Sequence, residues 1–175
     1  MLGSGPGKVD REMSSSVQRV QAALVAAGVT ARVVELPQST RSAREAANAI
    51  GCEVEQIAKS LVFRRLDNDE PVLVIAGGQN RVDEQLLAAH LQAPIAKADA
   101  EFVRRTTGFA IGGVPPLGHA TPVRTLIDRD LLELDVIWAA AGTPHAVVSL
   151  TPQQLLAATG GQVVRVSSST GGRPE

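Results

Sequence analysis

The residues of this chain best suited to binding a ligand form one loop, Gly108-Phe109-Ala110-Ile111-Gly112-Gly113-Val114-Pro115-Pro116-Leu117-Gly118-His119. Glycine lets backbone amides approach a ligand closely, and two successive prolines stiffen the loop and remove two amide donors. We therefore expect a rigid surface loop that presents the amides of Gly112 and Gly113, because such loops more often serve function than bulk stability. His119 closes the loop with the side chain that most often transfers protons near neutral pH, although a lone loop histidine is more often structural or exposed.

Lys59 is a second candidate, next to Ser60 and in front of the apolar run Leu61-Val62-Phe63. A lysine at the edge of an element usually lies in solvent. The alternative is a compact ammonium aimed into a cleft, where it binds a phosphate or polarises a carbonyl. The pairs Arg64-Arg65 and Arg104-Arg105 are candidates for a phosphate-contacting patch, although paired arginines usually form a solvated surface.

Several common kinds of site find no support in the sequence. The three histidines, His90, His119 and His145, show no metal-ligand spacing, so we expect no metal site. Cys52 has no CxxC partner and is interpreted as a small buried hydrophobe. No serine lies in a GxSxG motif, and Gly77-Gly78 is not part of a GxGxxG dinucleotide fingerprint. Local chemistry alone therefore names no reaction.

Composition limits the class of protein. The chain has 175 residues, 44% of them hydrophobic, a formal net charge of −1 and no tyrosine. This length fits one domain with an aliphatic core, and the few aromatic residues argue against a surface that stacks nucleic-acid bases. Any contact with a nucleic acid, tRNA or DNA alike, must then be a local patch, and we expect no DNA partner. A lone cysteine suits a reducing cytoplasm, and the absence of a long apolar run predicts no membrane span.

The elements that must position these residues alternate irregularly between helix and strand. We expect a helix capped by Ser15 or Ser16 with Val17, Val20 and Leu24 inward, and a buried central strand at Val72–Ala76. Further helices are predicted at residues 42–51, 53–58, 83–91, 99–106 and 151–160, and strands at 32–36, 59–64, 122–127, 135–141, 146–150 and 163–166. The pattern predicts a single α/β domain on a mixed, curved, partly barrel-like sheet flanked by helices.

The same sequence pattern divides the chain into three segments. Residues 1–13 are glycine-rich and polar, and we expect a flexible N-terminal extension without a secretory signal core. The folded domain is predicted to span residues 14–167. Residues 168–175 are rich in serine and glycine and are predicted to form a flexible tail.

Three segments in this order resemble the YbaK/EbsC family of single-domain aminoacyl-tRNA deacylases, which are similar to the editing insertion of bacterial prolyl-tRNA synthetases. They are the stretch from Ala58 to Phe63, the Gly/Pro loop, and Val136-Ile137-Trp138-Ala139-Ala140-Ala141-Gly142. The family's lysine matches Lys59, its Gly-x-x-x-Pro loop matches residues 112–116, and its pocket glycine matches Gly142. The chain departs from many members at Ala140, where they carry serine, and at Thr143-Pro144, where they often carry a basic pair.

The resemblance implies the editing-domain fold and hydrolysis of the ester that joins a wrong amino acid to a tRNA, tRNA-Pro or a related one. It implies a catalytic role for Lys59 and a substrate-binding role for Ser60, Gly112, Gly113, Pro116, His119 and Gly142. The amides of Gly112, Gly113 and Gly142 would bind the carbonyl oxygen, and water or the vicinal hydroxyl of the substrate would attack. It implies no cofactor, the aminoacyl-tRNA 3′ end as partner, and an aminoacyl-tRNA synthetase as a further candidate partner in the cytoplasm.

Two alternatives to this enzyme stay open at this point. The first is a non-catalytic module of the same fold that binds tRNA ends or a synthetase. The second is a deacylase fold recruited to a small-molecule ester or a nucleotide. Ala140 in place of the family serine favours the first alternative, whereas the retained lysine and loop favour the enzyme.

Overall fold

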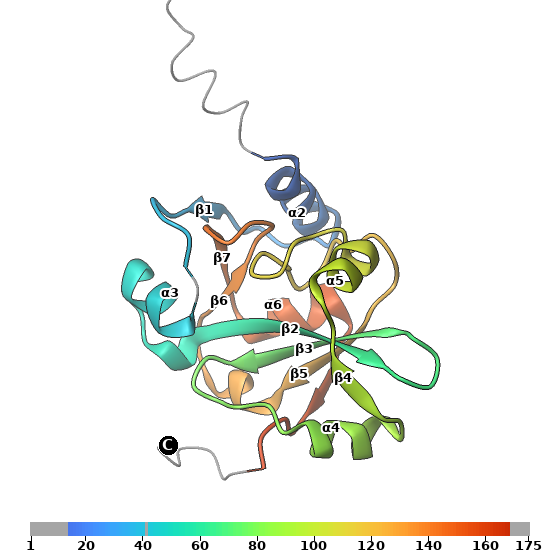
Figure 1. Ribbon diagram of the computed structural model, residues 1–175. Coiled ribbons are helices and arrows are strands. Elements are labelled where there is room, and N and C mark those ends of the chain that lie inside the picture. Colours follow the sequence, from blue (N-terminus) through green and yellow to red (C-terminus); the bar gives the residue numbers. More distant parts are fainter. Residues whose placement is uncertain (1–13, 41, 169–175) are drawn as a thin grey trace, which may run out of the picture.

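A computed structural model describes residues 14–40 and 42–168 (Figure 1). Along the chain the helices are α2 (Ser15–Ala26), α3 (Ala43–Ile50), α4 (Glu84–Leu91), α5 (Ala100–Thr107) and α6 (Pro152–Thr159). The strands are β1 (Val33–Glu35), β2 (Ile57–Arg65), β3 (Pro71–Gly77), β4 (Ile95–Lys97), β5 (Arg124–Asp128), β6 (Ile137–Ala140), β7 (Ala146–Leu150) and β8 (Gln162–Val164). Short 3-10 turns cover Val54–Gln56 (η1) and Arg129–Glu133 (η2). The predicted extension at 1–13, and the predicted tail from residue 169 on, lie outside the described residues.

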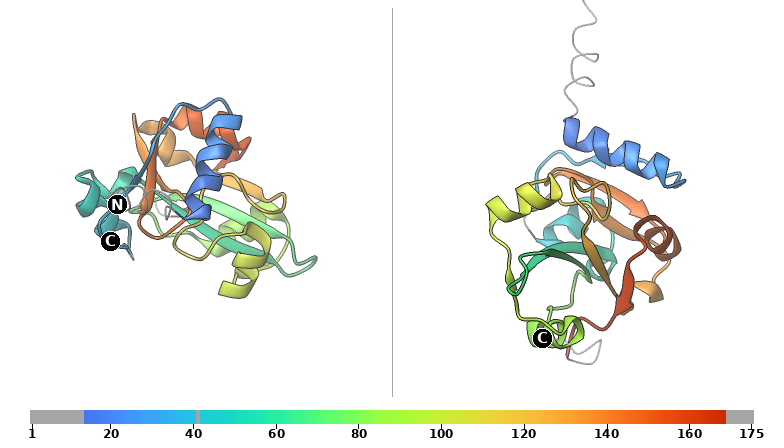
Figure 2. Two further views of the ribbon diagram at one scale, coloured as in Figure 1. Left: turned by 90° about the horizontal axis from the view of Figure 1, so that it is seen from above. Right: turned by 90° about the vertical axis from the view of Figure 1, so that its right-hand side faces the viewer.

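The strands form one mixed sheet of eight, in the order β1-β7-β6-β2-β3-β5-β8, with β4 paired to β2 beside this path. The β2–β6, β3–β5 and β5–β8 pairs are parallel and the other pairs are antiparallel. The sheet curves strongly, and helices lie around it (Figure 2). The predicted α/β domain on a mixed, curved sheet is therefore confirmed. β3 is central as predicted, since it pairs with both β2 and β5 and is buried from Val72 to Gly77.

Most helix boundaries follow the predicted capping residues. The Ser42 hydroxyl accepts the Glu45 amide at 3.1 Å at the start of α3. Thr151 and Gln154 form the predicted capping box of α6, and Gly51 and Gly160 end their helices in the left-handed conformation. The prediction for α2 was wrong by one residue, because Ser14 is the cap and its hydroxyl accepts the Val17 amide at 3.1 Å.

The predicted helix at residues 53–58 is wrong, and its correction changes the setting of Lys59. Only Val54–Gln56 turn, and β2 begins at Ile57 because Ile57 and Ala58 pair with β6 in parallel. Pairing across the sheet outweighs the weak local helix preference of so short a segment. Lys59 consequently lies inside a strand, opposite Ala76 of β3, rather than at a junction between elements.

Helix α2 packs its apolar side chains into the main core cluster. Val17, Val20 and Leu24 are fully buried in one apolar cluster that also holds Phe109 of the Gly/Pro loop. Arg19 from the same helix donates to the Gly108 carbonyl at 2.7 Å and lies 4.3 Å from the centre of the Phe109 ring. The helix therefore holds the loop against the sheet. Within residues 14–40 and 42–168, no helix is long and apolar enough to cross a membrane.

Candidate active site

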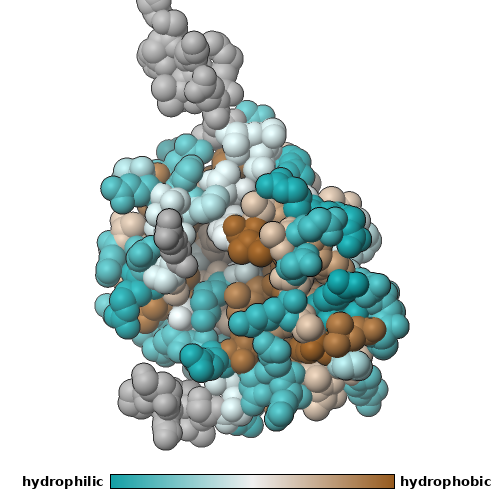
Figure 3. All heavy atoms as spheres, in the orientation of Figure 1, coloured by the Kyte–Doolittle hydropathy of each residue, from teal (hydrophilic) through white to brown (hydrophobic). Residues whose placement is uncertain are grey.

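Two cavities open on either side of Lys59 and share one wall. The larger has a volume of about 820 Å³ and the smaller of about 280 Å³. Apolar surface gathers in the middle of the face seen in Figure 1, with hydrophilic side chains around it (Figure 3). The shared wall joins β2 to the Gly/Pro loop and consists of Lys59, Ser60, Leu61, Ile111, Gly112 and Val114.

The larger cavity is lined by several charged side chains. Arg81 and Glu84 border it beyond the end of β3, Lys97 borders it from β4, and Lys59 reaches it from β2. The three cations outnumber the single carboxylate among these lining residues, so the cavity favours an anionic ligand. A volume of this size is typical of pockets for small molecules and cofactors.

The smaller cavity is lined mostly by small apolar side chains from β6, β7 and α3. Trp138 and Ala140 border it from β6, and Ala46 borders it from α3. Lys59 is the only charged residue among the described residues of its wall. The cavity is therefore suited to a small, uncharged group.

The Lys59 ammonium is anchored where the two cavities meet. Its Nζ donates to the Asn80 carbonyl at 2.6 Å. Partial burial of the ammonium lowers the pKa of Lys59 below its ordinary value; the nearby Asp128 opposes this shift and Arg81 adds to it. The side chain is thus a positioned cation with a weakened hold on its proton.

Ser60 brings an unused hydroxyl to the same wall. Its Oγ is buried and has no hydrogen-bond partner among the described residues. A buried hydroxyl without a partner is costly, and Ser60 is a residue of the wall that both cavities share.

The Gly/Pro loop contributes fewer amides than expected. Gly112 borders both cavities with φ +93°, and none of the hydrogen bonds of the described residues uses its amide. The Gly113 amide instead donates to the Ala110 carbonyl, and the Gly142 amide donates to the Gly113 carbonyl, each at 2.9 Å. The expectation that the Gly113 and Gly142 amides bind a carbonyl oxygen is therefore corrected, because both donors are already satisfied.

Gly113 and Gly142 are needed for close packing. A Cβ on Gly113 would lie 2.7 Å from the Thr143 Cα, and one on Gly142 would lie 2.8 Å from the Ser16 carbonyl oxygen. Gly142 also has φ +115°. These two glycines join the Gly/Pro loop, the β6–β7 turn and α2 into one unit, and neither borders either of the two cavities at Lys59.

Pro116 and His119 lie within the loop and border neither of the two cavities at Lys59. The His119 Nε2 lies 2.8 Å from the Pro115 carbonyl oxygen, which fixes the ring across the loop. Burial lowers the pKa of His119, and the contact with the carbonyl opposes the shift only in part. Neither residue therefore belongs to the wall that carries Lys59, their role in substrate binding stays a prediction, and the His119 contact braces the loop.

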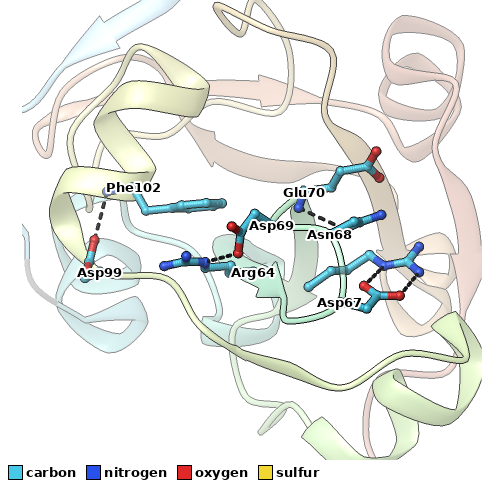
Figure 4. A network of polar contacts seen from close by, with 8 residues as sticks. Arg64, Asp67, Asn68, Asp69, Glu70, Asp99 and Phe102 are labelled. Carbon is cyan, nitrogen blue, oxygen red and sulfur yellow. Dashed lines mark hydrogen bonds and ion pairs between the residues drawn. The ribbon is translucent and has the colours of Figure 1, made fainter.

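The paired arginines do not form a patch at the cavities. Arg64 binds Asp69 and Arg65 binds Asp67, each at 2.8 Å, within the hairpin that joins β2 to β3 (Figure 4). Arg105 binds Glu101 of its own helix at 3.2 Å. None of the four arginines borders either cavity.

Sequence reasoning missed several lining residues. Asn80, Arg81 and Lys97 come from other segments, whereas Ile111 and Trp138 lie in segments that were singled out but were not themselves named as site residues. The Gly77-Gly78 turn was the available signal for the first two, because a chain that turns sharply after a buried strand often carries a site. Among residues 14–40 and 42–168, no group of histidine, cysteine, aspartate and glutamate side chains could hold a metal ion.

Comparisons with known proteins place the chain in a family. Residues 37–158 match a family model described as the aminoacyl-tRNA editing domain. The uncharacterised protein YwhH of Bacillus subtilis (strain 168) is 30% identical over 123 residues, which are 70% of this chain and 78% of YwhH. EbsC of Enterococcus faecalis, provisionally named a Cys-tRNA(Pro)/Cys-tRNA(Cys) deacylase, is 26% identical over 127 residues, 73% of this chain and 77% of EbsC.

Solved structures show the same fold. A crystal structure provisionally described as a trans-editing enzyme for prolyl tRNA synthetase superposes with a TM-score of 0.84 and 47% identity. The superposition covers 90% of this chain and 99% of that one. Since the family model spans more than half of the chain and YwhH is 30% identical over most of its length, the chain belongs to the aminoacyl-tRNA editing domain family, which includes the YbaK/EbsC proteins that it resembles.

Proposed function

We propose that this protein hydrolyses the ester bond of mischarged aminoacyl-tRNA, as a deacylase that acts on tRNA released from its synthetase. The observation that carries the proposal is the position of Lys59 between a cationic cavity and a small apolar one. An aminoacyl-tRNA end has the same two parts, an anionic nucleotide and a small amino acid, and the ester joins them. The scissile bond would lie at Lys59.

The larger cavity would take the terminal nucleotide of the tRNA. Arg81 and Lys97 border it beside Lys59, and no hydrogen bond or ion pair of the described residues uses the side chain of Arg81 or Lys97. These cations can contact phosphates without first breaking internal pairs. With a net charge of −1 for the whole chain, this local patch is what would attract the acceptor end.

The smaller cavity would take the amino acid. Its alanine-rich wall and volume of about 280 Å³ suit a small uncharged side chain such as that of alanine, cysteine or serine. Ala140 makes this wall more apolar than a serine would. Because one methylene group is worth only about 1–3 kcal/mol in such a pocket, we expect graded selectivity among small side chains.

The chemistry would rest on positioning and charge rather than on a resident base. A water molecule attacks the ester carbonyl carbon, the bond to the ribose 3′ oxygen breaks, and that oxygen takes up the proton lost by the water, which gives the free amino acid and uncharged tRNA. If the vicinal 2′ hydroxyl attacks first, the aminoacyl group moves to the 2′ oxygen, and water then hydrolyses that ester in the same way. Lys59 and the Gly112 amide would stabilise the oxyanion, and the Ser60 hydroxyl would orient the substrate. An aminoacyl ester is already activated, so these contributions can supply much of the acceleration.

Two similar proteins support tRNA-Pro as the substrate, since their descriptions refer to Cys-tRNA(Pro) and to prolyl tRNA synthetase. A synthetase is the proposed partner that would deliver the tRNA. The test measures release of labelled amino acid from tRNA-Pro charged with alanine, cysteine, serine, threonine or proline, for the wild type, Lys59→Met and Arg124→Met. Arg124 is an exposed cation on β5 that borders neither cavity, so it provides the matched control.

We expect release from at least one mischarged tRNA, a loss of roughly 100- to 1,000-fold in Lys59→Met and none in Arg124→Met. Undiminished release by Lys59→Met would refute the assignment of Lys59. Tight binding of charged tRNA with no release from any member of the panel would instead support the non-catalytic module, which the replacement of the family serine by Ala140 favours.

A further inference from the structure

We propose that Asp128 is the positioning residue for Lys59, acting through the loop of residues 77–80, although Asp128 borders neither cavity. The proposal rests on the proposed function for its consequence in catalysis, but its structural part can be measured without a substrate.

A chain of hydrogen bonds connects the two residues. Asp128 ends β5 with only 1% of its surface exposed. Its Oδ2 accepts the Gly77 amide at 2.9 Å and the Asn80 side-chain amide at 2.7 Å. The carbonyl of Asn80 then accepts the Lys59 ammonium at 2.6 Å. One buried carboxylate therefore fixes the group that holds the ammonium.

The loop between them has little freedom to adopt another shape. The Asn80 amide donates to the Gly77 carbonyl at 2.9 Å, which closes a turn. A Cβ on Gly78 would overlap the Val54 carbonyl oxygen, so the turn lies directly against η1. Asn80 is 9% exposed, and its side-chain amide also donates to Asp130 at 2.9 Å. With the turn held in this way, a displacement of Asp128 is transmitted to the Asn80 carbonyl.

Asp128 also acts on Lys59 through its charge. Burial weakens the hold of Lys59 on its proton and Arg81 adds to the effect, whereas Asp128 opposes both. The other charged groups at the larger cavity are Glu84 and Lys97, and Asp130 lies beyond Asn80. Loss of the Asp128 charge should therefore lower the pKa of Lys59 further and leave less of it charged near neutral pH.

The experiment compares the wild type with Asp128→Asn, Asn80→Ala and Thr151→Val. Asp128→Asn keeps the size of the side chain but removes its charge and one of its acceptors. Asn80→Ala removes the link and leaves the Asp128 charge in place. Thr151→Val removes a helix cap of α6, far from the site in the sequence, and controls for a general loss of stability.

The first readout is the rate at which a neutral acylating reagent modifies each lysine as a function of pH, followed by mass spectrometry. The chain has three lysines, Lys8, Lys59 and Lys97, so Lys97 serves as an internal reference. We expect the Lys59 profile to move to lower pH in Asp128→Asn. At neutral pH its modification should then be about three- to tenfold faster than in the wild type, because more of the amine is neutral. The profile in Thr151→Val should coincide with that of the wild type.

The second readout is single-turnover deacylation. We expect Asp128→Asn and Asn80→Ala to lower the rate constant at saturating tRNA by about 10- to 100-fold with little change in KM. An Asp128→Asn protein with the Lys59 profile and turnover of the wild type would overturn the proposal. If Asp128→Asn does not fold, wild-type turnover in Asn80→Ala overturns it instead. A shifted Lys59 profile in a protein without deacylase activity would retain the positioning role and refute only the proposed function.

Discussion

Lys59 needs its proton to stabilise a developing oxyanion, and its burial makes that proton easier to lose. The pKa of Lys59 lies below its ordinary value, so the charged form is present at low pH and is lost as the pH rises through the lowered pKa. We predict that kcat, corrected for spontaneous hydrolysis, falls with rising pH well before an exposed lysine would titrate. The measurement is deacylation across about pH 7 to 10.

Lys59→Arg is the matched variant for this pH dependence. A guanidinium keeps its charge across the whole range, so the alkaline fall should disappear even if the maximal rate is lower. An identical fall in Lys59→Arg would assign the titration to another group.

Gly113 illustrates how a residue next to the site can serve packing. A Cβ would lie 2.7 Å from the Thr143 Cα, which is backbone and cannot rotate away. We predict that Gly113→Ala lowers the free energy of unfolding by about 1–3 kcal/mol or more in urea titrations. Gly160→Ala provides the comparison, because a Cβ there meets nothing within 4 Å and only its φ of +64° costs energy. Equal stability losses in the two variants would contradict the packing argument.

At the scale of the elements, His119 fixes the second half of its loop, because its ring lies against the Pro115 carbonyl four residues earlier. Burial lowers its pKa in the folded state, so the unfolded chain binds a proton that the folded chain resists. The free energy of unfolding should therefore be retained above about pH 6.5 and fall as the pH drops below it. We predict that His119→Gln, which can still donate to the Pro115 carbonyl, loses less stability between about pH 7.5 and 5.

Urea titrations of both proteins at several pH values measure this difference. Because His119 borders neither cavity, deacylation by His119→Gln should stay close to that of the wild type. A large loss of turnover at unchanged stability would return the residue to the proton-transfer role that its sequence suggests.

Local signals in the sequence predicted most of the elements. Capping residues such as Ser42 and Thr151 act on amides three positions away, so their effect is visible in the sequence itself. The segment at 53–58 failed for the opposite reason, since its conformation depends on β6, some 80 residues later. The same holds for the two amides of Gly113 and Gly142, whose acceptors are set by contacts between loops.

The residues of the candidate site also fall into those with a local sequence signal and those without one. Lys59 and the Gly/Pro loop could be recognised because their residue types and order are distinctive. Arg81 and Lys97 stand in no recognisable motif, and only the pairing of β4 with β2 brings Lys97 to the same cavity. The contact between Asn80 and Asp128 joins residues 48 positions apart and leaves no local pattern.

At the scale of the whole molecule, charge should limit how tRNA is captured. A net charge of −1 gives no long-range attraction for an anionic partner, so the few cations at the larger cavity must supply it. We predict that KM for charged tRNA rises with salt and that Lys97→Met reduces the slope of log KM against log salt by about 0.7. The rate constant at saturating tRNA should change little.

Arg165→Met is the control for this salt dependence, because Arg165 binds backbone carbonyls near the end of the described chain, away from both cavities. If the slope of log KM against log salt were the same in Lys97→Met and in the wild type, the tRNA phosphates would bind at another surface than the larger cavity.

Strand β2, which carries Lys59, pairs with β3, β4 and β6. Lys59 therefore lies in the middle of the sheet and not in a loop. Such a strand opens only when the whole domain opens. The amides around Lys59 should therefore exchange with deuterium only through global unfolding, and heat should abolish catalysis and tertiary structure along the same curve. The turnover that remains at each temperature would then equal the folded fraction, and no folded but inactive state should be populated before unfolding.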